Sequence, residues 1–213
     1  MLAEASKRGR GEIPLPSLWD SGIYHLTNKN ADYAKKLAQQ IGNIIHTTEV
    51  IVRDSPGMLT STKGLSFHTD HHKADWIIWY CHKQTSEGGE SILVDGIKVF
   101  DSLPNNEKNS LERVRLFEHK IFEDDKESQA FIEDSGADKK MYYSFWEQEP
   151  VTENEKDALE LFETSLHNAQ HTRILLQPGD ILAIDNRRIL HGRTPITGTK
   201  DRHLTRHWIN TNP

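Results

Sequence analysis

The sequence predicts a mainly β domain with flanking helices, arranged as a double-sheet jelly roll or a related barrel. Three observations support this fold class. The 213 residues suit one domain with one core, eight short segments are rich in β-branched and aromatic residues, and helical segments lie irregularly between them. Such scattered short strands favour two packed antiparallel sheets over an alternating α/β fold.

The N-terminal part combines a charged start with one helix. MLAEASKRGRGEIPLPSLWD has positive charge but no apolar run behind it, so we expect no secretory signal and interpret residues 1–20 as a loose arm. NADYAKKLAQQIG (30–42) has apolar residues at helical spacing and ends at a glycine. The apolar positions are Tyr33, Ala34, Leu37, Ala38 and Ile41. This helix should cover the core of a single domain that spans residues 1–213.

The eight expected strands follow this helix. They are TTEVIV (47–52), DWIIWYC (75–81), GESILVD (89–95), RLFEHKIF (115–122), KMYYSFW (140–146), TRILLQ (172–177), DILAID (180–185) and RHLTRHWI (202–209). QPGD (177–180) reads as a turn between two of them. Two helices are expected among the strands, at 105–114 and 153–168. The second begins with a capping box, because Thr152 precedes Glu155 by three residues.

Composition narrows the function classes. The formal net charge of -6 argues against general nucleic-acid binding, which needs clustered basic residues. No apolar run approaches the length of a membrane span. The single cysteine, Cys81, excludes an internal disulfide framework, fits a reducing cytoplasm and is expected to be a buried, inert thiol. The expected partner is therefore a small-molecule substrate.

Histidine is more informative, because 12 are present and three of them lie in HTDHH. His68 and Asp70 are two residues apart, so on an extended strand both side chains would leave the same face and could bind one ion. His191, just after DILAID, offers a third ligand. Two histidines and a carboxylate form the facial triad of non-haem Fe(II) oxygenases. Alone, however, an HxD pattern is more often a surface turn or a satisfied core histidine.

Two further patterns favour the metal site. RHLTRHWI alternates so that Arg202, Leu204 and Arg206 share one face, and two core-facing guanidiniums need anions to pair with them. A dicarboxylate co-substrate would supply those anions, whereas a solvated edge strand would need none. In QTSEGGES a glycine turn leads to Ser91, whose hydroxyl could donate to a carboxylate. Three protein ligands would leave room on the metal for O2 and a bidentate 2-oxoglutarate.

Several motifs together resemble the taurine-dioxygenase-like (TauD-like) superfamily of Fe(II)/2-oxoglutarate oxygenases. The resemblance is carried by LSFHTD and WYCHKQTSEGGESILVDG within 64–101, and by LQPGDILAIDNRRILHGR and RHLTRHW within 175–209. Within the superfamily the sequence is most similar to γ-butyrobetaine and trimethyllysine hydroxylases. The resemblance implies a double-stranded β-helix, which is a jelly-roll core.

The resemblance also implies roles for individual residues. It makes His68, Asp70 and His191 the iron ligands. Arg202 would pair with the distal carboxylate of 2-oxoglutarate, with help from Ser91, and Arg206 would lie near the iron-bound end or the substrate. The implied reaction hydroxylates an aliphatic C–H bond of a small molecule and gives succinate and CO2. Because a carboxylate occupies position 70, no coordination position is left for chloride, and hydroxylation is favoured over halogenation.

Candidate substrate contacts lie near the ligand motifs. They are Trp146 with Tyr142 and Phe145, Glu147, and the flanking residues His71, His72, Asn186 and Arg188. Glu147 could pair with a cationic amine, and an amino-acid-like substrate follows from that hypothesis. Each of these residues is also explained by packing.

Three other functions use the same residues. A desaturase or cyclase would keep the ligand set. A zinc-dependent hydrolase would use the same three ligands, although HExxH and HxHxDH are missing from the sequence. A non-catalytic jelly roll would bind 2-oxoglutarate through Arg202 and Arg206 without turning it over.

Overall fold

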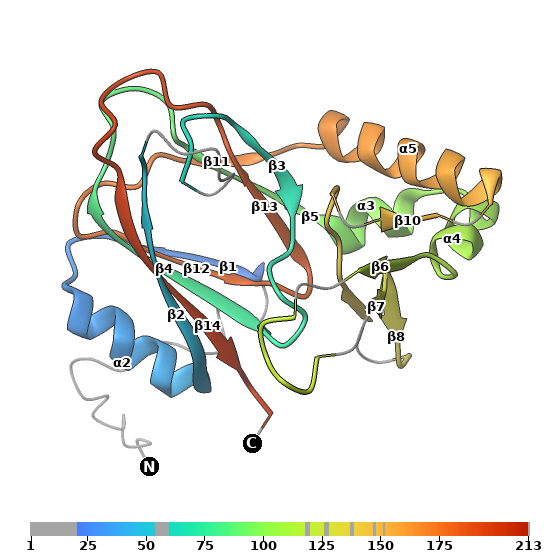
Figure 1. The fold of residues 1–213 in the computed structure, drawn as a ribbon, viewed down its shortest axis with the longest axis horizontal. Helices are drawn as coiled ribbons and strands as arrows, with labels where there is room; N and C mark the ends of the chain where they lie inside the picture. The colour runs from blue at the N-terminus through green and yellow to red at the C-terminus, as the bar shows by residue number, and fades with distance from the viewer. Residues whose placement is uncertain are drawn as a thin grey trace, which may run out of the picture.

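A computed structural model gives the structure of the protein (Figure 1). It describes residues 21–53, 60–117, 120–125, 128–136, 139–146, 148–150 and 152–212. The expected N-terminal arm, residues 1–20, therefore lies outside the described residues.

Two antiparallel sheets form the jelly roll. The larger has the strand order β1 (Ile23–Leu26), β12 (Ile181–Asp185), β4 (Trp76–Lys83), β14 (His203–Asn210) and β2 (Asn43–Ile51). The smaller has the order β11 (Thr172–Ile174), β5 (Ser91–Asp95), β13 (Ile189–Arg193) and β3 (Leu65–His68). The fold class predicted from the sequence is confirmed.

Strand alternation explains the layers. Trp76 and Ile78 of β4 face helix α2 (Ala31–Ile41), whereas Ile77 and Trp79 face the smaller sheet. The central strand is consequently buried on both sides. Asn30 is the N-cap of helix α2, and its side chain accepts a hydrogen bond from the Tyr33 backbone N–H. The helix lies within the range 30–42 that the sequence predicted.

A second group of elements, which we call the lobe, packs beside the sheets (Figure 1). It contains α3 (Gly96–Ser102), α4 (Asn105–Leu111), α5 (Glu153–Asn168), the small sheet β10 (Gln148–Glu149), β6 (Arg115–Phe117) and β7 (Ser128–Ala130), and the hairpin β8 (Ile132–Asp134) and β9 (Lys139–Met141). The capping box of Thr152 and Glu155 is present at the start of α5.

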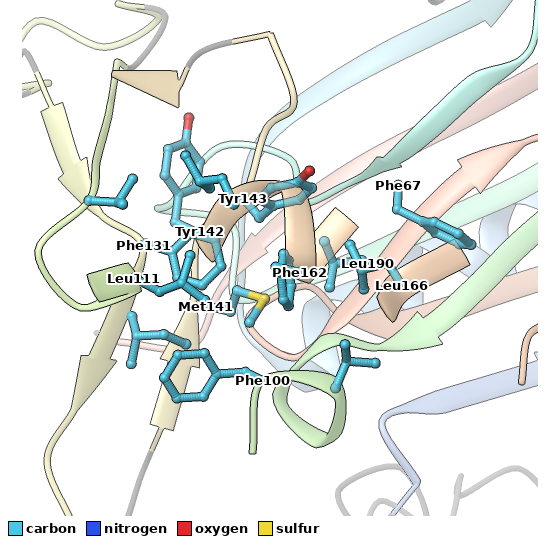
Figure 2. Packing of buried hydrophobic residues seen from close by; sticks show 14 of the residues in the cluster. Phe67, Phe100, Leu111, Phe131, Met141, Tyr142, Tyr143, Phe162, Leu166 and Leu190 are labelled. Carbon is cyan, nitrogen blue, oxygen red and sulfur yellow. The ribbon is translucent and has the colours of Figure 1, made fainter. Parts of the chain in front are cut away.

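The lobe has an aromatic core (Figure 2). Phe162 of α5 meets Phe131 edge-on at a ring-centroid distance of 5.0 Å and Tyr143 at 5.2 Å. Phe131 also meets Tyr143 edge-on at 5.8 Å. All three side chains are buried, so these contacts join α5 to the residues that lie just after β7 and β9.

Several expected elements differ from the structure. Of the strand expected at 115–122, the described residues contain β6 at Arg115–Phe117 and no strand at 120–122. The strand expected at 140–146 ends at Met141. After Met141 the backbone leaves strand pairing, because Tyr143 bonds Thr69 instead: the Thr69 N–H donates to the Tyr143 carbonyl at 2.8 Å. The apolar residues of KMYYSFW thus serve the lobe core. The sequence did not predict helix α3 or strands β1, β3, β7, β8, β10 and β13. The helix expected at 105–114 ends at Leu111.

Candidate active site

Two strands of the smaller sheet bring the two candidate histidines together. His68 is the last residue of β3 and His191 lies within β13, where the two are paired directly across the strands. Their ring centroids are 4.3 Å apart. Asp70 lies beyond the end of β3, so our expectation that His68 and Asp70 share one strand was wrong. Its carboxylate nevertheless reaches both histidines.

The three side chains surround a common point. Asp70 Oδ1 is 3.8 Å from His68 Nε2 and 3.7 Å from His191 Nε2. These separations exceed hydrogen-bond length but suit atoms that each lie about 2 Å from one metal ion. His68 Nδ1 is 2.9 Å from the Ser66 carbonyl oxygen, which places the proton on Nδ1 and the lone pair on Nε2. The donor set therefore fits a divalent metal.

The charge states of the triad also fit a metal. Burial lowers the pKa of His68, and burial together with the charge of His68 lowers the pKa of His191 well below its ordinary value. Burial raises the pKa of Asp70, but Arg206 and the two histidines outweigh it and lower that pKa. Neutral imidazoles and an ionised carboxylate are the forms that bind metal ions.

Two residues of β14 fix the Asp70 carboxylate. Arg206 Nη1 donates to Oδ1 at 3.0 Å and to Oδ2 at 2.8 Å, and the Trp208 indole N–H donates to Oδ2 at 2.7 Å. Oδ1 is the atom nearest both histidines. Trp208 was not predicted as a site residue, although the alternation of RHLTRHWI already places it on the face of Arg202 and Arg206.

Asn186 positions the loop that carries Asp70. Its Oδ1 accepts the Asp70 backbone N–H at 2.8 Å, and its Nδ2 donates to the Ala74 carbonyl at 2.7 Å. Asn186 is buried and was predicted only as a residue flanking the ligand motifs. Its contacts explain how Asp70 is held in place without strand pairing.

A cavity between the two sheets contains the triad histidines and the predicted anion-binding residues. Its polar lining includes Ser91, Arg202 and Arg206 together with His68 and His191. Its apolar lining consists of Val50, Leu65, Trp79, Leu93, Leu182 and Leu204. The structure thus brings the expected metal ligands and the expected 2-oxoglutarate residues to one place.

Arg202 is the notable charge in this cavity. It is 4% exposed, and among the described residues no acidic side chain pairs with it and its Nε has no hydrogen-bond partner. Burial, with the nearby charge of Arg193, lowers its pKa to about 10, so it remains charged at neutral pH. A buried, uncompensated guanidinium is costly, and an anion in the cavity would relieve that cost.

Arg193 is a cavity residue that we did not predict. Its Nη2 donates to the carbonyl oxygens of Ser61 and Lys63, both at 2.7 Å. It lies two residues after His191 on β13 and therefore on the same face. The two-residue spacing of His191 and Arg193 in the sequence HGR could have predicted this position. Arg193 adds positive charge to the cavity wall.

The predicted substrate contacts separate into different environments. The Trp146 ring lies 5.2 Å from the His68 ring, so Trp146 borders the triad. His71 Nε2 contacts Asp125 Oδ2 at 3.0 Å, and its ring stacks on Trp208. Arg188 binds Asp95 through its Nε at 2.8 Å and Nη2 at 2.7 Å.

The remaining substrate candidates contact other aromatic side chains or lie outside the described residues. The Tyr142 ring is 6.4 Å from His72, and Phe145 packs edge-on against Trp146. Glu147 lies outside the described residues. Of the predicted substrate contacts, Trp146 therefore contacts the side chain of a triad ligand, and Asn186 contacts the backbone of Asp70.

A jelly roll with two histidines, one carboxylate and a buried cationic cavity defines a class of metal-centred proteins. Residues 27–208 match the family described as "Taurine catabolism dioxygenase TauD, TfdA family", and the chain belongs to this family. The match confirms the resemblance seen in the sequence motifs. No described helix is long and apolar enough to cross a membrane.

Individual relatives agree with the family. Human γ-butyrobetaine dioxygenase is 29% identical over 226 residues, which cover 89% of this chain and 57% of that protein. The enzyme of the same name from Pongo abelii matches equally well. The chain thus spans a little more than half the length of these curated relatives.

Solved structures support the fold. Asparagine oxygenase in complex with Fe(II), hydroxyasparagine and succinate is 20% identical, with a TM-score of 0.75, and the match covers 92% of this chain and 78% of that one. The non-haem iron oxygenase OrfP in complex with Fe and α-ketoglutaric acid is 16% identical, with a TM-score of 0.68, and the match covers 83% and 63% of the two chains.

Proposed function

We propose that this protein is an Fe(II)- and 2-oxoglutarate-dependent oxygenase that hydroxylates an aliphatic C–H bond of a small, amino-acid-like molecule. Succinate and CO2 are the co-products. The observation that carries the proposal is the unpaired, buried Arg202 in the same cavity as His68 and His191. A metal site alone suits several chemistries, whereas a metal site beside a buried cation suits a chelating dicarboxylate.

Each residue has a distinct task in this proposal. His68, Asp70 and His191 would hold Fe(II), which supplies the oxidising chemistry together with O2 and 2-oxoglutarate. Arg202 binds the distal carboxylate of 2-oxoglutarate, with Ser91 as an additional hydroxyl donor, and thereby sets the length of acid that fits. Arg206 and Trp208 keep Asp70 ionised and correctly oriented. The apolar cavity wall limits the access of water.

The substrate is proposed from position and from the relatives. Trp146 borders His68 and offers an aromatic face to an aliphatic or cationic group. The solved relatives include complexes with hydroxyasparagine and hydroxyarginine, and the curated relatives are named for γ-butyrobetaine. Glu147 stays a predicted amine partner. His71 and Arg188 would act on the pocket through Trp208 and Asp95, the residues that they contact.

The test is 2-oxoglutarate turnover by the Fe(II)-loaded protein in air. A panel of L-amino acids and betaines is screened for succinate release, and products are examined by mass spectrometry for one added oxygen. We expect at least one substrate to raise succinate formation above the rate without substrate, and Arg202→Met to raise the KM for 2-oxoglutarate. A product that has lost two hydrogens and contains no added oxygen would instead indicate a desaturase or cyclase.

Two results would overturn the oxygenase proposal. Tight 2-oxoglutarate binding without succinate formation across the panel would indicate a binding protein. Hydrolytic activity that survives iron removal and requires zinc would indicate a hydrolase.

A further inference from the structure

The outer face of the larger sheet carries a second cluster of metal-binding side chains. Glu49 of β2, His203 of β14 and His82 of β4 come from three neighbouring strands (Figure 1). Alternation along β14 places His203 on the face opposite Arg202 and Leu204, so this cluster lies outside the cavity. Helix α2 covers another part of the same face, near Ile209.

The two histidines lie side by side on one face of the sheet, next to a β-bulge. Strand pairing joins His203 to Lys83 and Leu204 to Cys81, so His82 is the additional residue between two successive pairs. A bulge redirects the side chain of its additional residue. The pairing of Thr205 with Tyr80 shows that His82 and His203 share one face. The His82 ring stacks on the His203 ring, with a centroid separation of 4.4 Å and an interplanar angle of 23°.

The donor atoms converge around one point. His203 Nε2 is 2.5 Å from Glu49 Oε2. His82 Nε2 is 2.7 Å from the Thr205 hydroxyl, which in turn donates to Glu49 at 2.9 Å. One ligand atom from each of Glu49, His82 and His203 lies within 4.8 Å of the other two. The hydroxyl of Thr205 occupies the space among them.

We infer that Glu49, His82 and His203 form a second divalent-metal site, of the zinc class, that fastens β2, β4 and β14 together. Two imidazoles and a carboxylate are ligands that Zn²⁺ accepts, with water or the Thr205 hydroxyl as a fourth. The side chains of His203 and Glu49 are 31% and 49% exposed, so an ion can reach them from solvent. This inference is independent of the proposed function.

The protonation states of the cluster favour the ion. Burial raises the pKa of Glu49, but hydrogen bonds from His203 and Thr205 outweigh it and lower that pKa. Burial and the charge of His203 lower the pKa of His82. An ionised carboxylate and a neutral imidazole are the forms that bind a metal ion.

The test counts zinc ions. Metal-free protein is titrated with ZnSO4 in a calorimeter near neutral pH, and the retained zinc is measured by elemental analysis after desalting. Because the ligands of the triad in the cavity are also ones that zinc accepts, we expect two equivalents in the wild-type protein, one in His191→Ala, one in His203→Gln, and none in the double variant. X-ray absorption of zinc-loaded His191→Ala should show two imidazole ligands.

The matched control is His25→Gln. His25 Nε2 contacts Asp180 Oδ2 at 3.0 Å, which is a histidine–carboxylate pair that belongs to no group of three metal-binding side chains among the described residues. This variant should retain both equivalents. Zinc should also raise the Tm of His191→Ala, and this rise should disappear in the double variant with His203→Gln.

The alternative is that Glu49, His82 and His203 form a hydrogen-bonded cluster that binds no metal ion. It predicts that well-folded His191→Ala binds no zinc, or binds zinc that His203→Gln does not remove, and either result overturns the inference. Since Glu49→Gln preserves the size of the side chain and its ability to accept from Thr205, it serves if His203→Gln fails to fold. Loss of one zinc equivalent in Glu49→Gln supports the site, and its retention contradicts it.

Discussion

The lobe and the cavity between the two sheets bury different kinds of side chain. The cavity has buried charge: Arg202, Arg206 and the triad residue Asp70 are all less than 10% exposed. The lobe core is aromatic and aliphatic, with Phe131 and Phe162 fully buried. The comparison shows that the sheets and the Asp70 loop hold buried charges in place through backbone pairing and buried hydrogen bonds, whereas the lobe stabilises the protein by apolar contact.

The comparison is tested most severely at Asp70, where loss of one charge leaves another unpaired. Asp70→Ala should abolish iron binding and turnover, and it should also lower the free energy of unfolding by about 3–5 kcal/mol because Arg206 loses its partner in a buried site. Iron content and urea denaturation measure the two effects. Adding Arg206→Met to Asp70→Ala should restore stability without restoring iron binding. No recovery in the double variant would show that the pair is not the source of the loss.

In the lobe, a substitution at Phe162 should lower stability and leave ligand binding unchanged. Phe162→Ala should cost about 3–5 kcal/mol of unfolding free energy, because the cavity it leaves is enclosed by Phe131 and Tyr143. Below its lowered Tm the variant should bind Fe(II) and 2-oxoglutarate as the wild-type protein does. Calorimetric titration at low temperature measures this. Phe162→Leu, which keeps more volume, should cost less.

A smaller effect on stability is expected at Asn186, whose side chain forms hydrogen bonds with the backbone of the Asp70 loop. Asn186→Ala should cost about 1–3 kcal/mol, because the Asp70 N–H and the Ala74 carbonyl lose their buried partner. It should also weaken Fe(II) binding roughly 10–100-fold, since the group that orients a ligand is removed. Competition with a chelating dye measures the affinity. Unchanged affinity would assign Asn186 to stability alone.

The smallest effect is expected at the start of α5. Thr152→Ala should cost about 1 kcal/mol through loss of the helix cap, and iron and 2-oxoglutarate binding should be unaffected. Thr152→Ser is the matched control because it keeps the hydroxyl that accepts the Glu155 N–H. A change in 2-oxoglutarate affinity would mean that the lobe and the cavity are coupled.

The same comparison explains what could be predicted from the sequence. The strand face of Arg202, Leu204 and Arg206 was predicted because alternation alone determines which side chains share a face. His68, Asp70 and His191 were suggested by residue chemistry and by the resemblance of their motifs. The site of Asp70 beyond β3 depends on the hydrogen bonds of Asn186, which no local pattern encodes.

Short strands and the lobe were harder to predict. β13, with the sequence ILHGR, has one glycine and two polar side chains in five residues, so its strand propensity is weak. Its burial comes from pairing with β3 and β5, which is a long-range effect. KMYYSFW has strong strand propensity, yet most of it packs in the lobe, because tertiary contacts override local preference.

The visible absorption of anaerobic protein with Fe(II) and 2-oxoglutarate tests whether the triad and Arg202 form one site. We expect a weak charge-transfer band of an iron–oxoacid complex in the wild-type protein, no band in His191→Ala, and a band in Arg202→Met that appears only at much higher 2-oxoglutarate concentration. No band in well-folded wild-type protein, or identical titrations of wild type and Arg202→Met, would contradict the proposed site.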